Sequence, residues 1–250
     1  MIPFALIVFG LIALPNSAAM HEPNKTAIFI HGAGGGGWEW NSWVPAFKKA
    51  GWVCIARDLV PAKAGIAETK FDDYVAQIEQ MAGQHKGDRI VLIGASMGGI
   101  IALKASESIG PAAVVLVNSV GPKGIQPGKP KTWPKVVEWS KGSLKETQDS
   151  MPDSDEATIQ FAFRHWRDES GSVLSEISSG IAVNAPQCPV LVALGEQDTD
   201  VPNLVGIEMA RQYGANLHIF KGMSHVGPLL GTKAPKVAAW VLNWLDEHVR

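Results

Sequence analysis

The chain has 250 residues, of which 46% are hydrophobic and 18% are charged, and its formal net charge is -2 at pH 7. A chain of this length can bury one sizeable core and lies in the range that α/β proteins occupy as a single domain. Its basic residues are scattered, so no basic stripe or patch indicates binding to nucleic acid or to an anionic membrane surface. We therefore expect its partner to be a small molecule.

The N-terminus predicts a secretory signal segment over residues 1–19. An apolar run at residues 2–14 is followed by a proline, an asparagine and the small residues 17–19, an order typical of a signal peptide that is cut after Ala19. The run is too short to span a bilayer as a helix, so no stable membrane anchor is expected. The mature domain would comprise residues 20–250 and be periplasmic or secreted. No Lys or Arg precedes the run, which keeps a cytoplasmic chain as the alternative.

Short apolar runs alternate with helix-like stretches along the rest of the chain. Continuous rather than alternating apolarity predicts strands that are buried on both faces, as in a parallel sheet. The expected strands cover residues 27–30, 52–56, 90–93, 113–117, 190–194 and 217–220, and the expected helices cover residues 43–50, 72–85, 97–108, 204–213 and 235–249. This alternation predicts a doubly wound, mostly parallel α/β sheet of about six strands with right-handed crossovers.

The alternation stops between about residues 121 and 187, where prolines and aromatic residues accumulate. The stretch is too long for an ordinary loop, so we expect a small, mostly helical cap insertion over one edge of the sheet. Some of its aromatic side chains could line an apolar pocket, but packing against the sheet is the expected role for most of them. These side chains are Trp133, Trp139, Phe161, Phe163 and Trp166.

The motif Gly94-Ala95-Ser96-Met97-Gly98 lies between an expected strand and an expected helix. This is the G-x-S-x-G context of a nucleophile elbow, a sharp turn that lifts a serine hydroxyl above the end of the strand. So strained a turn needs neighbours without Cβ atoms, which accounts for Gly94 and Gly98. Ser96 is therefore the candidate nucleophile. The N–H of Met97, at the start of the helix, is in place to meet a developing oxyanion.

A second glycine cluster, at residues 31–37, follows the first expected strand and allows two interpretations. Gly32, Gly34 and Gly37 fit G-x-G-x-x-G, and Asp58 could take the place of a ribose-binding acid, so a dinucleotide-dependent oxidoreductase is an alternative from another class. Three tryptophans follow within six residues, and they are too bulky for a helix that packs closely beside a pyrophosphate. This favours a site without a dinucleotide cofactor.

The same glycine cluster resembles a segment of a known group of enzymes. The sequences His-Gly-Ala-Gly at residues 31–34 and Gly-Trp-Glu-Trp at residues 37–40 are similar to the oxyanion loop of the plant methylesterase and hydroxynitrile lyase group of α/β-hydrolases. The resemblance covers most of the chain after residue 25 and is weak in the insertion. It implies that the backbone N–H groups of Ala33 and Met97 form an oxyanion hole.

A serine hydroxyl needs a base to remove its proton and an acid to orient that base. Asp198 follows the expected strand at residues 190–194, in a segment that resembles the acid loop of the group, and it is the predicted acid. Asp200 and Glu196 are the alternatives. His225 lies between the last expected strand and the C-terminal helix, where the group carries its catalytic histidine. No spacing of Cys, His and acidic residues predicts a metal site.

Together these residues predict a serine hydrolase that cleaves a small-molecule carboxylic ester through an acyl-enzyme, with Ser96 as nucleophile, His225 as base and Asp198 as orienting acid. No metal or organic cofactor is implied, and the sequence does not predict an oligomeric state. The hydroxynitrile lyases of the group typically carry Thr and Lys where this chain has Gly32 and Val226, so hydrolysis is favoured over cyanide elimination. A ligand receptor of the same fold, which binds without turnover, is the remaining alternative.

Overall fold

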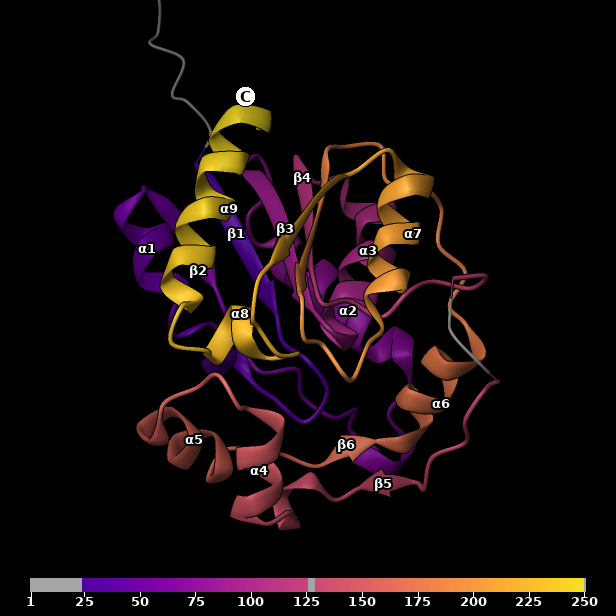
Figure 1. Cartoon of the computed structure of the whole chain (residues 1–250). Helices are drawn as coiled ribbons and strands as arrows, with labels where there is room; N and C mark the ends of the chain where they lie inside the picture. Colours follow the sequence, from indigo (N-terminus) through magenta and orange to yellow (C-terminus); the bar gives the residue numbers. More distant parts are fainter. Residues whose placement is uncertain (1–23, 126–128, 250) are drawn as a thin grey trace, which may run out of the picture.

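The computed structural model describes residues 24–125 and 129–249, and the expected signal segment lies outside the described residues. Six strands form one sheet in the order β2-β1-β3-β4-β7-β8, and every neighbouring pair is parallel (Figure 1). The strands are β1 (Lys25–Ile30), β2 (Trp52–Ile55), β3 (Arg89–Ala95), β4 (Ala113–Val117), β7 (Val190–Gly195) and β8 (Asn216–Phe220). The predicted doubly wound parallel sheet is confirmed.

Helices cover both faces of the sheet, which is why its central strands are apolar along most of their length. Leu92 and Val114 pack into a core with α2, α3 and α7, whereas the next residues along the chain, Ile93 and Val115, point to the opposite face and pack with α1 and α9. All four side chains have no exposed surface. The helices are α1 (Val44–Lys49), α2 (Phe71–Gly83), α3 (Met97–Ile109), α7 (Asn203–Tyr213) and α9 (Ala234–His248).

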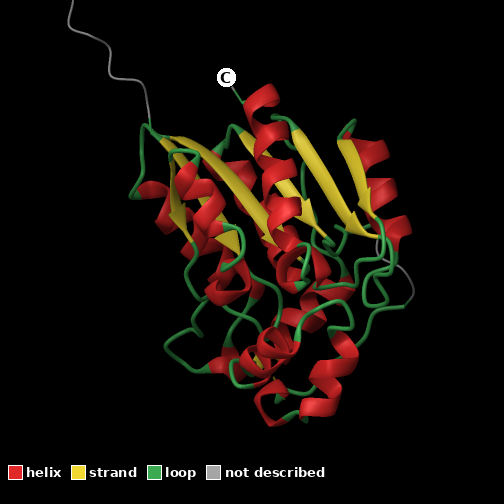
Figure 2. Ribbon diagram, turned by 60° about the vertical axis from the view of Figure 1, so that its left-hand side comes forward, coloured by secondary structure: helices red, strands yellow, loops and turns green. Residues whose placement is uncertain are grey.

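Between β4 and β7 the chain leaves the sheet and builds a cap beyond the carboxyl ends of the strands, where the arrowheads point in Figure 2. The cap contains β5 (Val136–Val137), the 3-10 helix η3 (Trp139–Lys141), α4 (Leu144–Ser150), α5 (Glu156–Phe163), β6 (Glu169–Ser170) and α6 (Gly171–Ser179). β5 and β6 pair in antiparallel fashion. The sequence does not predict this ribbon, because strands of two residues carry no periodic pattern. The expected limits of the insertion, about residues 121 and 187, stay a prediction.

The described residues also contain three short elements, namely the 3-10 helices η1 (Gly37–Trp40) and η2 (Ile66–Glu68) and the helix α8 (Gly227–Leu230). Cys54 and Cys188 are both free thiols. Within residues 24–125 and 129–249, no helix has both the length and the apolar character needed to cross a membrane.

Candidate active site

Ser96 occupies a sharp turn between β3 and α3. Its φ of 51° and ψ of -118° lie outside the conformations that a residue with a side chain ordinarily adopts. A Cβ atom on Gly94 would lie 2.2 Å from the carbonyl oxygen of Gly98, and one on Gly98 would lie 2.2 Å from that of Ile30. Strand, turn and helix therefore approach so closely that both flanking positions must be glycine.

Backbone hydrogen bonds hold this turn to the neighbouring strand. The N–H of Ser96 donates to the carbonyl oxygen of Val117 at 3.0 Å, and the carbonyl oxygen of Ser96 accepts from the N–H groups of Gly99 at 3.1 Å and Val120 at 3.3 Å. The first residue of α3, Met97, has no intrahelical acceptor for its N–H, as at the start of any helix. Its N–H thus stays available beside the serine.

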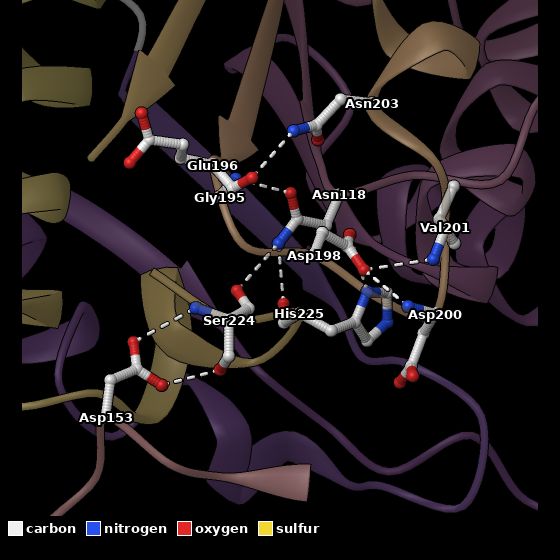
Figure 3. Close-up of polar contacts among 10 residues, drawn as sticks. All are labelled: Asn118, Asp153, Gly195, Glu196, Asp198, Asp200, Val201, Asn203, Ser224 and His225. Carbon is white, nitrogen blue, oxygen red and sulfur yellow. Dashed lines mark hydrogen bonds and ion pairs between the residues drawn. The ribbon is translucent and has the colours of Figure 1, made fainter. Parts of the chain in front are cut away.

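His225 and Asp198 are brought together from two loops at the carboxyl ends of β7 and β8. Nδ1 of His225 lies 2.8 Å from Oδ2 of Asp198, and the two side chains are 12% and 1% exposed. The other carboxylate oxygen of Asp198 accepts the backbone N–H groups of Asp200 and Val201, each at 2.9 Å (Figure 3). Both oxygens have partners, so the carboxylate has a fixed direction toward the imidazole.

The two alternative acids have other positions. Oε2 of Glu196 accepts the N–H of Gly222 at 3.0 Å, and its side chain points away from the imidazole in Figure 3. Asp200 supports Asp198 through its own N–H and is one of the residues that line the cavity described below. Of these three acids, all within the described residues, Asp198 is the one in hydrogen-bond contact with His225.

The surroundings of His225 favour its charged form. Burial opposes the imidazolium and lowers its pKa, but the hydrogen bond and the charge of Asp198 together outweigh burial, and the charges of Asp200 and Glu39 act in the same direction. The pKa of His225 is therefore raised above its ordinary value. A base of this kind accepts a proton more readily than a free histidine does.

Asn118 ties the two loops of this pair together, and the sequence analysis missed it. It follows β4 and has a φ of 44°. Its side-chain NH2 donates to the carbonyl oxygens of His225 at 2.6 Å and Ser224 at 3.3 Å, and its side-chain oxygen accepts the N–H of Gly195 at 2.7 Å (Figure 3). A polar residue directly after a buried strand was the one available indication of such a role.

Asp153 holds the histidine loop from the cap. Its carboxylate accepts the hydroxyl of Ser224 at 2.6 Å and the N–H of Ser224 at 3.2 Å (Figure 3). A Cβ atom on Gly227 would lie 2.0 Å from the same carboxylate, so a side chain there would displace the carboxylate. The residue next to His225 is thus fixed by the insertion. No local sequence pattern links two residues that are this far apart along the chain.

His31 is buried and supports the loop formed by the glycine cluster at residues 31–37. The N–H of Leu59 donates to Nε2 at 2.8 Å, which places the ring proton on Nδ1, and Nδ1 lies 2.7 Å from the carbonyl oxygen of Gly32. Burial lowers the pKa of His31 to about 4, against an ordinary value of 6.5. The ring is therefore neutral at physiological pH and holds the loop through both nitrogens.

Glu39, in η1, is a second buried titratable group beside the glycine cluster, and no sequence motif assigns it a role. Its Oε2 accepts the N–H of Gly32 at 2.9 Å. Burial raises the pKa of Glu39 to about 7, although the hydrogen bond from Gly32 and the charge of His225 act in the opposite direction. Near neutral pH a large fraction of this carboxyl group carries its proton.

Between sheet and cap lies a cavity of about 740 Å³. The candidate residues Ala33, Ser96, Met97 and His225 line its floor. Its cap side combines the aromatic and apolar residues Trp133, Trp139, Trp166, Leu174 and Ile177 with polar and charged residues, among them Glu138, Lys141, Glu146 and Thr147. Phe161 and Phe163 are not among the lining residues. Phe161 instead stacks on His165, with ring centroids 3.8 Å apart.

The glycine cluster does not have the arrangement of a dinucleotide site. The chain continues from Gly37 into the 3-10 helix η1 rather than into a long α-helix. The Asp58 carboxylate accepts the N–H of Gly37 at 2.8 Å and pairs with Arg167 at 3.0 Å, so it is already engaged within the protein. Among the residues that the structure describes, no group of His, Cys, Asp and Glu has the arrangement of a metal site.

The six parallel strands, the turn at Ser96 and the overlying cap define the architecture of an α/β-hydrolase. A family model described as "Alpha/beta hydrolase family" matches residues 27–240. The chain belongs to this family.

Comparison with individual proteins gives relatives of the same kind. A rice protein (Oryza sativa subsp. indica) named probable esterase PIR7A is 33% identical over 96 residues, which are 35% of this chain and 35% of the rice protein. The match thus spans about a third of the length of that relative.

Solved structures show the same fold over nearly the whole chain. Tomato methylketone synthase I in complex with 2-tridecanone has a TM-score of 0.72 and 16% identity, over 90% of this chain and 99% of that one. The methylesterase MES16 from Arabidopsis has a TM-score of 0.70 and 14% identity, over 89% of this chain and 99% of that one.

Proposed function

We propose that the protein is a serine esterase that hydrolyses a small-molecule carboxylic ester through an acyl-enzyme. The observation that carries the proposal is that Ser96 and His225 meet at one cavity with Asp198 behind the histidine. Ser96 and His225 both line the cavity, and Asp198 is fixed behind the imidazole at 2.8 Å from Nδ1. A serine, a base and an orienting acid in this order are the parts that acyl transfer requires.

In the first half of the reaction, Oγ of Ser96 attacks the carbonyl carbon of the ester, and the serine proton passes to Nε2 of His225. The carbonyl oxygen becomes an oxyanion, which the N–H groups of Ala33 and Met97 stabilise. The Asp198 carboxylate stabilises the imidazolium that forms. The imidazolium then donates its proton to the leaving alcohol as the bond from carbon to the alcohol oxygen breaks.

In the second half, water attacks the acyl-enzyme and gives a proton to the now neutral His225. A second tetrahedral intermediate forms and collapses. The bond between the acyl carbon and Oγ of Ser96 breaks, and the proton held by His225 returns to the serine. The products are a carboxylic acid and an alcohol, and none of these steps needs an added cofactor.

The cap supports a substrate with an apolar or aromatic part. Trp133, Trp139 and Trp166 line the cavity opposite the serine, and aromatic side chains of this kind bind apolar groups through buried area. The name of the rice relative, a probable esterase, and the description of the Arabidopsis protein as a methylesterase agree with an ester substrate.

Steady-state hydrolysis tests this proposal. The purified chain is assayed on p-nitrophenyl esters of increasing acyl length, with a lactone and an anilide as other acyl donors. We expect turnover of at least one ester, and we expect Ser96→Ala to lower kcat on the order of 10^4-fold or more. Ser108→Ala, on an exposed part of the same helix, is the matched control and should keep wild-type kcat. Saturable binding of the esters without turnover would overturn the proposal and favour a receptor.

A further inference from the structure

The carboxyl group of Glu39 is a buried group that the proposed mechanism does not use. The residue is 3% exposed and lines the cavity with Ser96 and His225. A Cβ atom on Gly32 would lie 3.4 Å from Cβ of Ser96 and 3.7 Å from Oε2 of Glu39. One glycine therefore separates the carboxyl from the serine. Burying such a group has a cost unless its hydrogen bonds are made, so its contacts call for an explanation.

The first contact is with the peptide between His31 and Gly32, just before the expected oxyanion residue Ala33. Oε2 of Glu39 accepts the N–H of Gly32 at 2.9 Å. A Cβ atom on Gly35 would lie 1.9 Å from Oε1 of Glu39, so the absence of a side chain at position 35 makes room for the carboxyl. Sequence and packing thus agree in seating this group against the loop.

A second buried carboxyl group acts on the other side of Ala33. Glu169, in β6 of the cap, is 3% exposed, and its Oε2 accepts the N–H of Gly34 at 3.3 Å. Its Oε1 accepts the hydroxyl of Tyr74 and the N–H of Ser170, each at 2.7 Å. Two carboxyl groups therefore bind the N–H groups on either side of Ala33.

The peptide unit that carries the Ala33 N–H is itself held through its carbonyl. That carbonyl belongs to Gly32, and its oxygen lies 2.7 Å from Nδ1 of His31 and accepts the N–H of Gly35 at 3.3 Å. In a trans peptide the N–H points opposite to the carbonyl. Fixing the carbonyl therefore fixes the direction of the Ala33 N–H. Ala33 lines the cavity, and its N–H donates no hydrogen bond to any described residue.

We propose that Glu39 is a positioning residue that holds the Gly32 peptide, so that the N–H of Ala33 is presented to the carbonyl oxygen of the substrate in the transition state. Glu169 holds the Ala33–Gly34 peptide from the cap. The inference rests on the proposed esterase function. Because Glu39 acts through the loop, its loss should weaken stabilisation of the oxyanion and leave ground-state binding of the ester nearly unchanged.

The test compares two substitutions of Glu39. Glu39→Gln keeps a carbonyl oxygen that can accept the Gly32 N–H, whereas Glu39→Leu has a similar volume and no acceptor. Glu107→Leu is the control, since Glu107 accepts the backbone N–H of Asn184 at 2.7 Å near the C-terminal end of α3 and does not line the cavity. All variants are assayed on the same p-nitrophenyl ester for kcat and KM.

We expect Glu39→Leu to lower kcat about 10- to 100-fold, below the loss measured when a whole oxyanion donor is removed, with KM within about threefold. Glu39→Gln should restore kcat to within about threefold of wild type, and Glu107→Leu should match wild type. Equal losses in the Gln and Leu variants, or no loss in the Leu variant, would overturn the proposal.

Inhibition by a transition-state analogue distinguishes loss of oxyanion stabilisation from a general structural defect. A trifluoromethyl ketone adds Oγ of Ser96 to its carbonyl carbon, the serine proton goes to His225, and the carbonyl oxygen becomes an oxyanion. Its inhibition constant should rise in Glu39→Leu by the same factor as kcat falls, while that of the matching methyl ketone should not change. A parallel weakening of both ketones would contradict a role in oxyanion stabilisation.

Two further variants distinguish a failure of the Glu39 proposal from a folding defect and from a failure of the esterase mechanism. If Glu39→Leu does not fold, Gly35→Ala takes its place, because the new Cβ would displace the Glu39 carboxyl. Wild-type kcat in a folded Gly35→Ala variant would overturn the proposal. Ser96→Ala is run in the same assay. If Ser96→Ala keeps full turnover, the esterase mechanism itself fails, whereas loss in Ser96→Ala with no loss in Glu39→Leu refutes the role of Glu39 alone.

Discussion

Replacing Glu39 by Gln should lower the free energy of unfolding in mild acid. The stability that is lost when His31 binds a proton is then no longer offset by the protonation of Glu39. Burial lowers the pKa of His31 from 6.5 to about 4, so the folded state binds this proton more weakly than the unfolded state does. The stabilisation is fully present above pH 6.5 and is lost as the pH falls toward 4. At about 1.4 kcal/mol per pKa unit the whole effect is about 3 kcal/mol, of which about 2 kcal/mol is lost by pH 5.

Glu39 has the opposite effect in the wild-type protein. Burial raises its pKa from 4.5 to about 7, so the folded state binds this proton more tightly than the unfolded state does. The stabilisation is present in acid and is lost as the pH rises through 7. Lowering the pH from 7.5 to 5 should therefore add about 2 kcal/mol to the free energy of unfolding. The contributions of His31 and Glu39 nearly cancel over this interval.

Urea unfolding at pH 7.5, 6 and 5 measures both contributions. Relative to wild type, Glu39→Gln should lose about 2 kcal/mol of unfolding free energy between pH 7.5 and pH 5, and His31→Gln should gain about 2 kcal/mol. Comparing each variant with wild type removes the contributions of groups that all three proteins share. Two variant profiles that run parallel to the wild-type profile would refute the reasoning.

Other predictions concern the acid, the base and the supports of the site. Asp198→Asn should keep the fold and lower kcat about 10^4-fold, whereas Asp200→Asn should change kcat little; the reverse order would move the acid to Asp200. kcat/KM should rise with pH through an apparent pKa above 6.5, because the pKa of His225 is raised and its neutral form is the base; a flat profile from pH 5 to 8 with chemistry rate-limiting would contradict a histidine base. Asn118→Ala should cost about 1–3 kcal/mol in urea unfolding and lower kcat; wild-type values of both would show that Asn118 does not hold the loops. Gly98→Ala should not fold, since its Cβ would lie 2.2 Å from a carbonyl oxygen; a soluble variant with wild-type stability would refute that contact.

The sheet was predictable because its strands are buried on both faces, which leaves continuous apolar runs in the sequence. The turn at Ser96 was predictable for a related reason. The glycines at positions 94 and 98 meet backbone atoms of α3 and β1, and contacts with backbone constrain the sequence whatever the neighbouring side chains are. The strands β5 and β6, at two residues each, had no pattern long enough to detect.

The supports of the site were not predictable, because they depend on contacts between distant segments. Glu39 lies between two tryptophans and looks like any charged residue until its burial against Gly32 is seen. Asp153 belongs to the cap yet holds Ser224 in the histidine loop. The choice among the three candidate acids likewise depended on the direction of side chains, which spacing alone does not give.

The most direct test of the central claim is covalent labelling of Ser96 by an organophosphonate with a good leaving group. In a working site Oγ of Ser96 attacks phosphorus, the leaving group departs, and His225 takes the serine proton, so the enzyme is trapped in a form that resembles the acylation intermediate. Peptide mass mapping of the native protein should find a single adduct, on Ser96. His225→Ala should slow the labelling by several powers of ten, on the order of the loss of kcat expected from removing a catalytic base. An adduct on another residue, or no adduct on the folded protein, would contradict the assignment of Ser96 as the nucleophile.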